Sequence, residues 1–254
     1  MRRIAIASAL LAVFVCAALA GEGAYFEYEV VVEGAGLPPE LAQQMGTKTM
    51  RTWFQDDMFK MDFGDGLQSV IVRKDKGVVW IVHGPQKVYS EFPFELFNQM
   101  MEQSKRQADQ MDENAEFKKT GRTKKIGRWN CYEVIATFRD PQGKQPVQKS
   151  YIWLTKAKEL DPKKLAETFK WDMFGQSDIN ERVLKYPELD GFPVQVISEG
   201  ETPQGKLKST MTLKNFQRKT FPKSIFEPPA GYRKMEIRTP QGGQMPMPVP
   251  PQGQ

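Results

Sequence analysis

Side chains that carry most enzyme chemistry are scarce in this chain. It contains one histidine, His83, and two cysteines, Cys16 and Cys131, among 254 residues. The patterns H-E-x-x-H, C-x-x-C, G-x-S-x-G and a glycine-rich phosphate loop are all missing. His83 stands at a predicted strand end, where a surface residue is commoner than a general base, and Cys131 fits a small buried hydrophobe better than a reactive thiol. The sequence therefore predicts no catalytic residue, no metal site, no cofactor and no enzyme activity.

Long apolar runs are also scarce, which excludes a membrane protein with several spans. Mean hydropathy is −0.54, and the one long run is Ile4 to Cys16. Arg2 and Arg3 precede this run, and the small residues Ala18 and Ala20 follow it. This order is typical of a secretory signal peptide over residues 1–20, cleaved near Ala20; the alternative is an uncleaved membrane anchor. We expect an exported protein that is periplasmic or secreted.

Cleavage changes the charge and the redox chemistry of the chain. It removes two of the 36 basic residues and no acidic residue, so the formal net charge falls from +5 to +3. The mature chain keeps Cys131 alone and has no internal disulfide. Its stability must therefore come from an apolar core, which a chain of this length can form.

The first half of the mature chain has the two-residue hydrophobic alternation of β-strands. In Tyr25 to Glu33 the side chains Phe26, Tyr28 and Val30 alternate with glutamates. Further strands are expected at 47–55, 58–63, 68–73, 78–82 and 87–91. The turns between them are short and charged, which favours an antiparallel meander over a parallel sheet with long crossovers.

The period then changes to that of a helix. From Pro93 to about Asn114 apolar residues gather on one side and charged residues on the other, so we expect an amphipathic helix with Pro93 in its first turn. Strands are expected again at 116–125, 130–139, 148–155, 193–199 and 206–216. A second helix is expected from Pro162 to Phe174, with Asp161 as its N-cap, and a last extended piece over 226–235.

Two of these strands are apolar on both faces. They are Val78 to Val82 and Tyr151 to Leu154. Both must be covered on both sides, by helices on one side and by a packed core or an apolar cavity on the other. The pattern predicts an α+β fold: a strongly curved antiparallel sheet of about ten to eleven strands, an unclosed half-barrel, with two or three helices covering its concave side.

Basic residues are concentrated in the stretch from residue 118 to residue 128. The six are Lys118, Lys119, Arg122, Lys124, Lys125 and Arg128. A solvated hairpin is the plainer interpretation, and contact with anionic lipid headgroups is the functional alternative. The export signal argues against nucleic acid as a partner.

The last sixteen residues are almost entirely Pro, Gln, Gly and Met. Residues 239–254 cannot form a core, and we expect them to be disordered. We expect residues 21–238 to form a single domain.

Three stretches carry a resemblance to a known family. They are TGRTKKIGRWNCYEV at 120–134, YIWLT at 151–155 and FEPPAGY at 226–232. With them the chain resembles the exported bacterial family called domain of unknown function 4412, which is similar in architecture to the outer-membrane lipoprotein carriers (LolA/LolB-like). The resemblance implies a curved, unclosed barrel with helices across its open side, and it implies that acyl chains are held in the concave groove.

The leading hypothesis is an exported, monomeric binding protein that holds a lipid or lipoprotein acyl chain between sheet and helices. Periodicity suggests six residues that line the groove: Trp80, Phe97, Met100, Trp153, Phe169 and Met173. The six basic residues named above would meet the headgroup. The alternative is a structural or interaction module of the cell envelope, with a solid core and another envelope protein as its partner.

Overall fold

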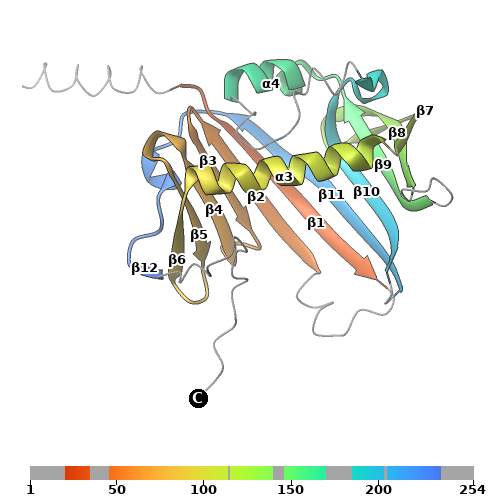
Figure 1. The fold of residues 1–254 in the computed structure, drawn as a ribbon. Helices are drawn as coiled ribbons and strands as arrows, with labels where there is room; N and C mark the ends of the chain where they lie inside the picture. The colour runs from red at the N-terminus through yellow and green to blue at the C-terminus, as the bar shows by residue number, and fades with distance from the viewer. Residues whose placement is uncertain are drawn as a thin grey trace, which may run out of the picture.

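One sheet of twelve strands runs through the part of the chain that the computed structural model describes, residues 21–34, 46–113, 115–139, 146–169, 185–202 and 205–235. Its strands are β1 (Ala24–Gly34), β2 (Thr47–Gln55), β3 (Met58–Phe63), β4 (Gln68–Arg73), β5 (Val78–His83), β6 (Val88–Pro93), β7 (Ala115–Ile126), β8 (Trp129–Arg139), β9 (Pro146–Thr155), β10 (Phe192–Thr202), β11 (Gly205–Arg218) and β12 (Arg233–Met235). Two α-helices, α3 (Phe94–Glu113) and α4 (Pro162–Phe169), lie on one side of the sheet (Figure 1). The predicted signal peptide and the predicted tail at 239–254 fall outside the described residues.

Two meanders that meet at the centre build the sheet. The strand order is β12-β6-β5-β4-β3-β2-β1-β11-β10-β9-β8-β7. The chain runs outward from β1 to β6, crosses to the opposite edge through α3, and returns from β7 to β11. There β11 pairs with β1 from Ala24↔Arg218 to Gly34↔Leu207, so strands from the two ends of the chain hold the halves together.

Most strand predictions are confirmed, several to the residue. The turn between β2 and β3 has Asp56 at φ 51°, as a two-residue hairpin loop requires. Among the described strands every pairing is antiparallel except one: β12 pairs with β6 in parallel. Of the expected last extended piece over 226–235, only Arg233–Met235 forms a strand, β12, and Phe226 ends a 3-10 helix, η5 (Lys223–Phe226). The sheet has twelve strands instead of ten to eleven.

The two helices begin close to the predicted residues. Pro93 ends β6 instead of entering the helix, and the amide of Phe94, the first residue of α3, donates to the carbonyl of Gly77. At α4 the Asp161 carboxylate accepts from the amides of Lys163 (3.0 Å) and Lys164 (3.4 Å), which confirms Asp161 as the N-cap. The predicted end of this helix lies outside the described residues.

The length of α3 requires the sheet to be curved. Ten strand-to-strand gaps separate β6 from β7, and at about 4.8 Å each they describe an arc of about 48 Å. The 20 residues of α3 span only about 30 Å. The helix joins the two strands directly, so it forms a chord across the concave side (Figure 1). The open, mostly antiparallel sheet agrees in outline with the predicted half-barrel.

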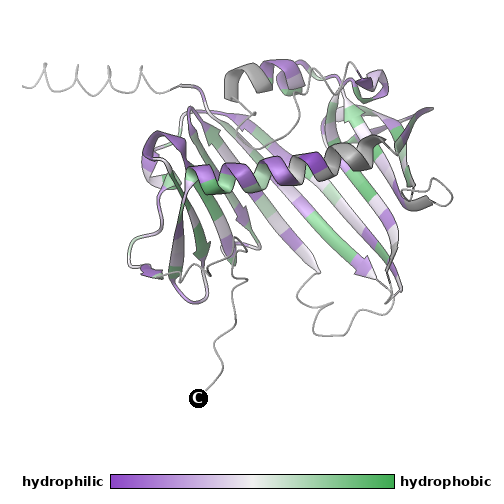
Figure 2. Ribbon diagram, in the orientation of Figure 1, coloured by the Kyte–Doolittle hydropathy of each residue, from purple (hydrophilic) through white to green (hydrophobic). Residues whose placement is uncertain are grey.

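Strands β2 to β5 contain many hydrophobic residues (Figure 2), and these residues pack into two clusters, one on each face of the strands. On the concave face Phe59, Val72 and Val79 pack under Phe94 at the start of α3. On the convex face Met58, Ile71 and Trp80 pack against the segment that carries Phe221 and Phe226. The second face of Val78 to Val82 is therefore covered by a packed core, formed by the C-terminal segment.

Two register shifts lie in the middle of the sheet. In the β1–β11 pair, Glu27 pairs with Asn215 and Tyr28 with Leu213, so Lys214 is the extra residue. In the β9–β10 pair the extra residue is Val194. Bulges strengthen the local twist and re-aim neighbouring side chains. Both bulges lie where the sheet lines the cavity described next.

Candidate functional site

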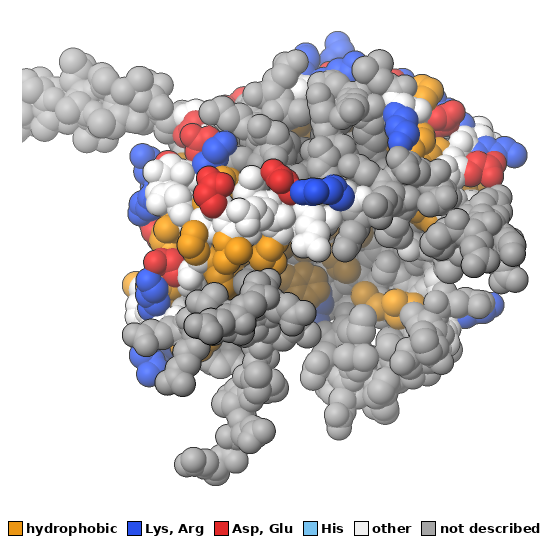
Figure 3. All heavy atoms as spheres, viewed as in Figure 1, with side chains coloured by type: hydrophobic (Ala, Val, Ile, Leu, Met, Phe, Trp, Pro, Cys, Tyr) orange, Lys and Arg blue, Asp and Glu red, His pale blue; other side chains and the backbone are white. Residues whose placement is uncertain are grey.

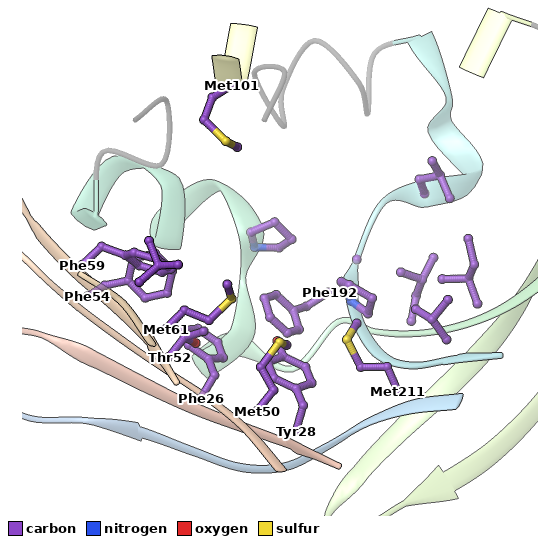
Figure 4. Close-up of a pocket in the computed structure, with 18 of the residues that line it drawn as sticks. Phe26, Tyr28, Met50, Thr52, Phe54, Phe59, Met61, Met101, Phe192 and Met211 are labelled. Atoms are coloured by element: carbon purple, nitrogen blue, oxygen red, sulfur yellow. The ribbon is translucent and has the colours of Figure 1, made fainter. Parts of the chain in front are cut away.

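An apolar cavity of about 700 Å³ lies between the concave face of the sheet and the helices. Strands β1 to β4 and β9 to β11 form its floor, and α3, the first residue of α4 and the 3-10 helix η4 (Pro187–Leu189) border it (Figure 4). In the space-filling view hydrophobic side chains gather below α3 and within the hollow there (Figure 3). Its lining residues are Phe26, Tyr28, Met50, Thr52, Phe54, Phe59, Met61, Val70, Phe97, Met101, Ile152, Leu154, Pro162, Leu189, Gly191, Phe192, Pro193, Val196 and Met211.

The cavity leaves apolar side chains without full packing. Met50, Met61 and Met211 are only half-buried, although they lie near the centre of the sheet. Methionine is flexible and polarizable, so a surface rich in it can adapt to ligands of different shape. Phe26 is fully buried and stacks on Phe192 at 5.6 Å, which gives the cavity a rigid aromatic wall.

Polar groups in the lining are few. Among the described lining residues there is no Asp, Glu, Lys, Arg or His, and only Tyr28 and Thr52 bring a side-chain hydroxyl. Burial raises the pKa of the Tyr28 phenol above its ordinary value. This environment favours neutral, apolar ligands, because an ionised group would lose its hydration without gaining a partner.

Two predicted lining residues lie elsewhere. Trp80 belongs to the convex core with Met58 and Phe226, and its indole donates to a Glu91 carboxylate oxygen at 2.9 Å. Neither Trp80 nor Trp153 is among the lining residues, whereas Ile152 and Leu154, the neighbours of Trp153, both are. Successive residues of a strand point to opposite faces, so Trp153 faces away from the cavity. A strand that is apolar on both faces does not indicate which face is concave.

The helical candidates have different outcomes. Phe97 lines the cavity, and on the same helix Met101 does so instead of Met100. Phe94, Phe97 and Met101 follow the i, i+3, i+7 spacing of one helix face, which the sequence offered as a signal. Phe169 ends α4, but its side chain is not among those described. Met173 lies outside the described residues.

The six basic residues are exposed on β7 and the turn after it. Arg122 and Lys124 cover the ring of Trp153 at 5.6 and 3.9 Å, on the face opposite the cavity. Lys119 lies 5.5 Å from the ring of Tyr132, and Arg128 lies 5.0 Å from that of Trp129. These four therefore have packing roles. Lys118 and Lys125 make no ion pair within the described part of the chain.

Beneath these cations lies a buried acid. The Glu133 side chain is only 2% exposed; it accepts from the Thr120 hydroxyl at 2.8 Å and pairs with Arg122 at 3.3 Å. Partial desolvation next to Glu133 also lowers the pKa of Lys124. This network stabilises the outer face of β7 to β9.

Other reactive groups do not converge on a site. Cys131 is buried, and burial raises the pKa of its thiol, which keeps it protonated and unreactive at neutral pH. His83 is half-buried at the end of β5 and is not in the lining. Over the described ranges, no three His, Cys, Asp or Glu side chains gather as a metal site would require. Within those ranges, too, no helix has the length and apolar character of a membrane span.

Several solved structures resemble the chain weakly. The lipoprotein LppX of Mycobacterium tuberculosis is 9% identical (TM-score 0.34), with 76% of this chain and 85% of that chain covered. A putative outer membrane lipoprotein-sorting protein domain from Vibrio parahaemolyticus is 11% identical (TM-score 0.27; 81% and 89% covered). PNGF-II is 11% identical (TM-score 0.34), and 85% of this chain spans only 31% of that one. No curated protein matches the sequence significantly.

The sequence itself matches a family model over most of its length. The match covers residues 38–232, which takes in the strands from β2 to β11, both helices and η5. The matched segment contains most of the cavity lining, including the lining residues of α3 and β9 to β11. The chain belongs to the family described as domain of unknown function (DUF4412).

Proposed function

We propose that this protein is an exported, non-enzymatic carrier that holds an acyl chain or a similar apolar ligand in the cavity between the sheet and α3. The observation that carries the proposal is the cavity of about 700 Å³ with half-buried apolar side chains around it. Ligand sites of small molecules span about 300–1,000 Å³. Each methylene group moved there from water is stabilised by about 0.8 kcal/mol.

The proposed ligand-contacting residues come from two parts of the fold. Phe97 and Met101 contribute from α3, and Met50, Val196 and Met211 from the sheet. We propose that one monomer, with residues 21–238 as its domain, is the binding unit, because a single copy of the chain already encloses the cavity from sheet and helix.

A fluorescent probe tests the proposal directly. The neutral dye N-phenyl-1-naphthylamine brightens in apolar sites, and the mature protein should bind it in a saturable way. Val196→Trp places an indole into the cavity and should abolish binding. Met235→Trp, on exposed β12, is the matched control and should bind normally. Undiminished binding by a folded Val196→Trp variant would contradict the cavity assignment.

A charged surface forms the second part of the proposal. Lys118 and Lys125, both exposed, would meet anionic headgroups while a lipid is loaded or released. The alternative function is an envelope interaction module with a filled interior and no ligand. A filled interior would bury the methionines of the concave face completely, whereas they are half-buried, so we prefer the carrier.

A further inference from the structure

Among the described lining residues of the cavity, Tyr28 has the longest polar side chain. Tyr28 lies in β1, at the middle of the twelve-stranded sheet. Its direct partner across the strand pair is Met50, and it lies near Met211 and Phe192 in the cavity (Figure 4). The ring stacks on Phe26 at 6.4 Å, which holds its orientation.

The Tyr28 hydroxyl makes no hydrogen bond within the described part of the protein. Tyr28 is half-buried among apolar side chains, and a tyrosine hydroxyl in such a site usually finds a partner, because an unpaired polar group there is costly. Tyr25, on the opposite face of the same strand, follows that rule and donates to Glu27 at 2.5 Å. Tyr132 does so as well, donating to the carbonyl of Asp190 at 2.6 Å. The Tyr28 hydroxyl therefore differs from those of Tyr25 and Tyr132, because it lies among apolar side chains without a hydrogen-bond partner in the described part of the protein.

The strand register of the β1–β11 pair shifts next to Tyr28. Opposite Tyr28, β11 contains its extra residue, Lys214, so that Tyr28 pairs with Leu213. The pairing of β1 with β2 stays regular through the same residues. The bulge therefore changes what the Tyr28 ring meets on the β11 side without moving Tyr28 from the concave face.

Resting on the proposed function, we propose that Tyr28 is the polar anchor of the ligand site and that it selects an apolar chain bearing one neutral hydrogen-bond acceptor, such as an ester carbonyl. A phenol donates one hydrogen bond, which a carbonyl accepts. None of the described lining residues carries a positive charge that could pair with a carboxylate, so an ionised fatty acid should bind less well at this position than its ester.

Thr52 is the other described lining residue with a side-chain hydroxyl, and it serves as the matched control. It pairs directly with Phe26 across β1 and β2, and its short side chain stays close to the sheet. Replacing Thr52 by Val removes a hydroxyl from the same cavity at almost constant size. The two variants thus differ in which hydroxyl is lost.

The test uses two competitors of equal chain length, methyl palmitate and hexadecane, against bound N-phenyl-1-naphthylamine. Wild-type protein should prefer the ester. In Tyr28→Phe the affinity for methyl palmitate should fall about three- to tenfold, the effect of one lost hydrogen bond, while hexadecane binding is unchanged. Thr52→Val should keep the preference, and palmitate at pH 8 should compete less well than its ester with the wild type.

Three results would overturn the assignment: equal losses for both competitors in Tyr28→Phe, no loss for either, or loss of the ester preference in Thr52→Val instead. Each leaves the carrier proposal intact, because hexadecane still displaces the dye. If the wild-type protein binds neither the dye nor either competitor, the proposed function itself fails.

Discussion

The two faces of the same strands differ in how completely they are packed. On the convex face of β2 to β5, Ile71 and the Phe226 side chain packed on it are 0% exposed. On the concave face, Met50, Met61 and Val70 are half-buried around a cavity. The convex face forms a continuous core, whereas the concave face is packed only under Phe94 and leaves space around the cavity. Apolar alternation alone therefore does not distinguish a core from a binding surface.

Truncation of a side chain on each face should produce the largest contrast. Phe226→Ala removes a fully buried ring from the convex core and should lower the free energy of unfolding by about 4 kcal/mol. Met211→Ala, on the cavity, should cost about 1 kcal/mol, because the removed atoms already border empty space. Urea denaturation of both variants measures the contrast. Equal losses would show that the two faces are packed alike.

Gln55 tests how the C-terminal segment is held on the convex face. Its side chain donates to the carbonyl of Phe221 at 3.3 Å and accepts from the Phe221 amide at 2.6 Å. Gln55→Leu leaves both backbone groups buried and unpaired and should cost about 3 kcal/mol of unfolding free energy. Binding of the dye on the concave face should stay within twofold. A stable variant would mean that Phe221 keeps its place without this pair.

Arg73 links the convex face to acid stability. Its guanidinium is buried and pairs with Asp75 at 2.7 Å and with Glu227, next to η5. The hydrogen bond from Arg73 lowers the pKa of Asp75. A carboxyl with a lowered folded-state pKa adds stability above its unfolded pKa, near 4, and loses it as the pH falls through the folded value.

Thermal unfolding should therefore show a loss of stability below about pH 4 in the wild type. In Arg73→Met the stability at pH 7 should fall by about 2 kcal/mol, and the acid decline should be shallower. Arg51→Met, which removes more exposed ion pairs with Glu27 and Asp65, serves as the control and should cost about 0.5 kcal/mol. An unchanged acid decline in Arg73→Met would contradict the assigned role of Asp75.

The smallest expected effect concerns the exposed cations of β7. Lys118→Glu with Lys125→Glu should leave stability within about 0.5 kcal/mol. The double variant should bind less to vesicles of phosphatidylglycerol and should not change toward phosphatidylcholine. Cosedimentation at two salt concentrations measures this. Binding that is equal for both vesicles in the wild type would remove the headgroup role.

Local rules predicted the elements well. The alternation in 47–55, 58–63 and 68–73 gave β2 to β4 with their observed bounds, because each strand is short and bounded by tight turns. The helix over 94–113 followed from its amphipathic period. Asp161 followed from the chemistry of a helix N-terminus. These features depend on residues that are near one another in sequence.

What the sequence did not predict depends on distant residues. Alternation separates the two faces of a strand but does not identify the concave one, so it cannot exclude Trp80 and Trp153 from the groove. The parallel pairing of β12, the bulges at Lys214 and Val194 and the cavity itself depend on contacts between the two ends of the chain. In the sequence, Tyr28 is one of several apolar residues that alternate with glutamates. Only the structure shows that its side chain lines a cavity.

The most direct test of the central claim is native mass spectrometry of the mature protein, purified without detergent from the envelope of its own host, beside the Val196→Trp variant. If the cavity holds a lipid, the wild type should carry a discrete extra mass that organic solvent releases as lipid, and the variant should carry none. A clean unliganded mass for the wild type, together with no uptake of the dye, would contradict it.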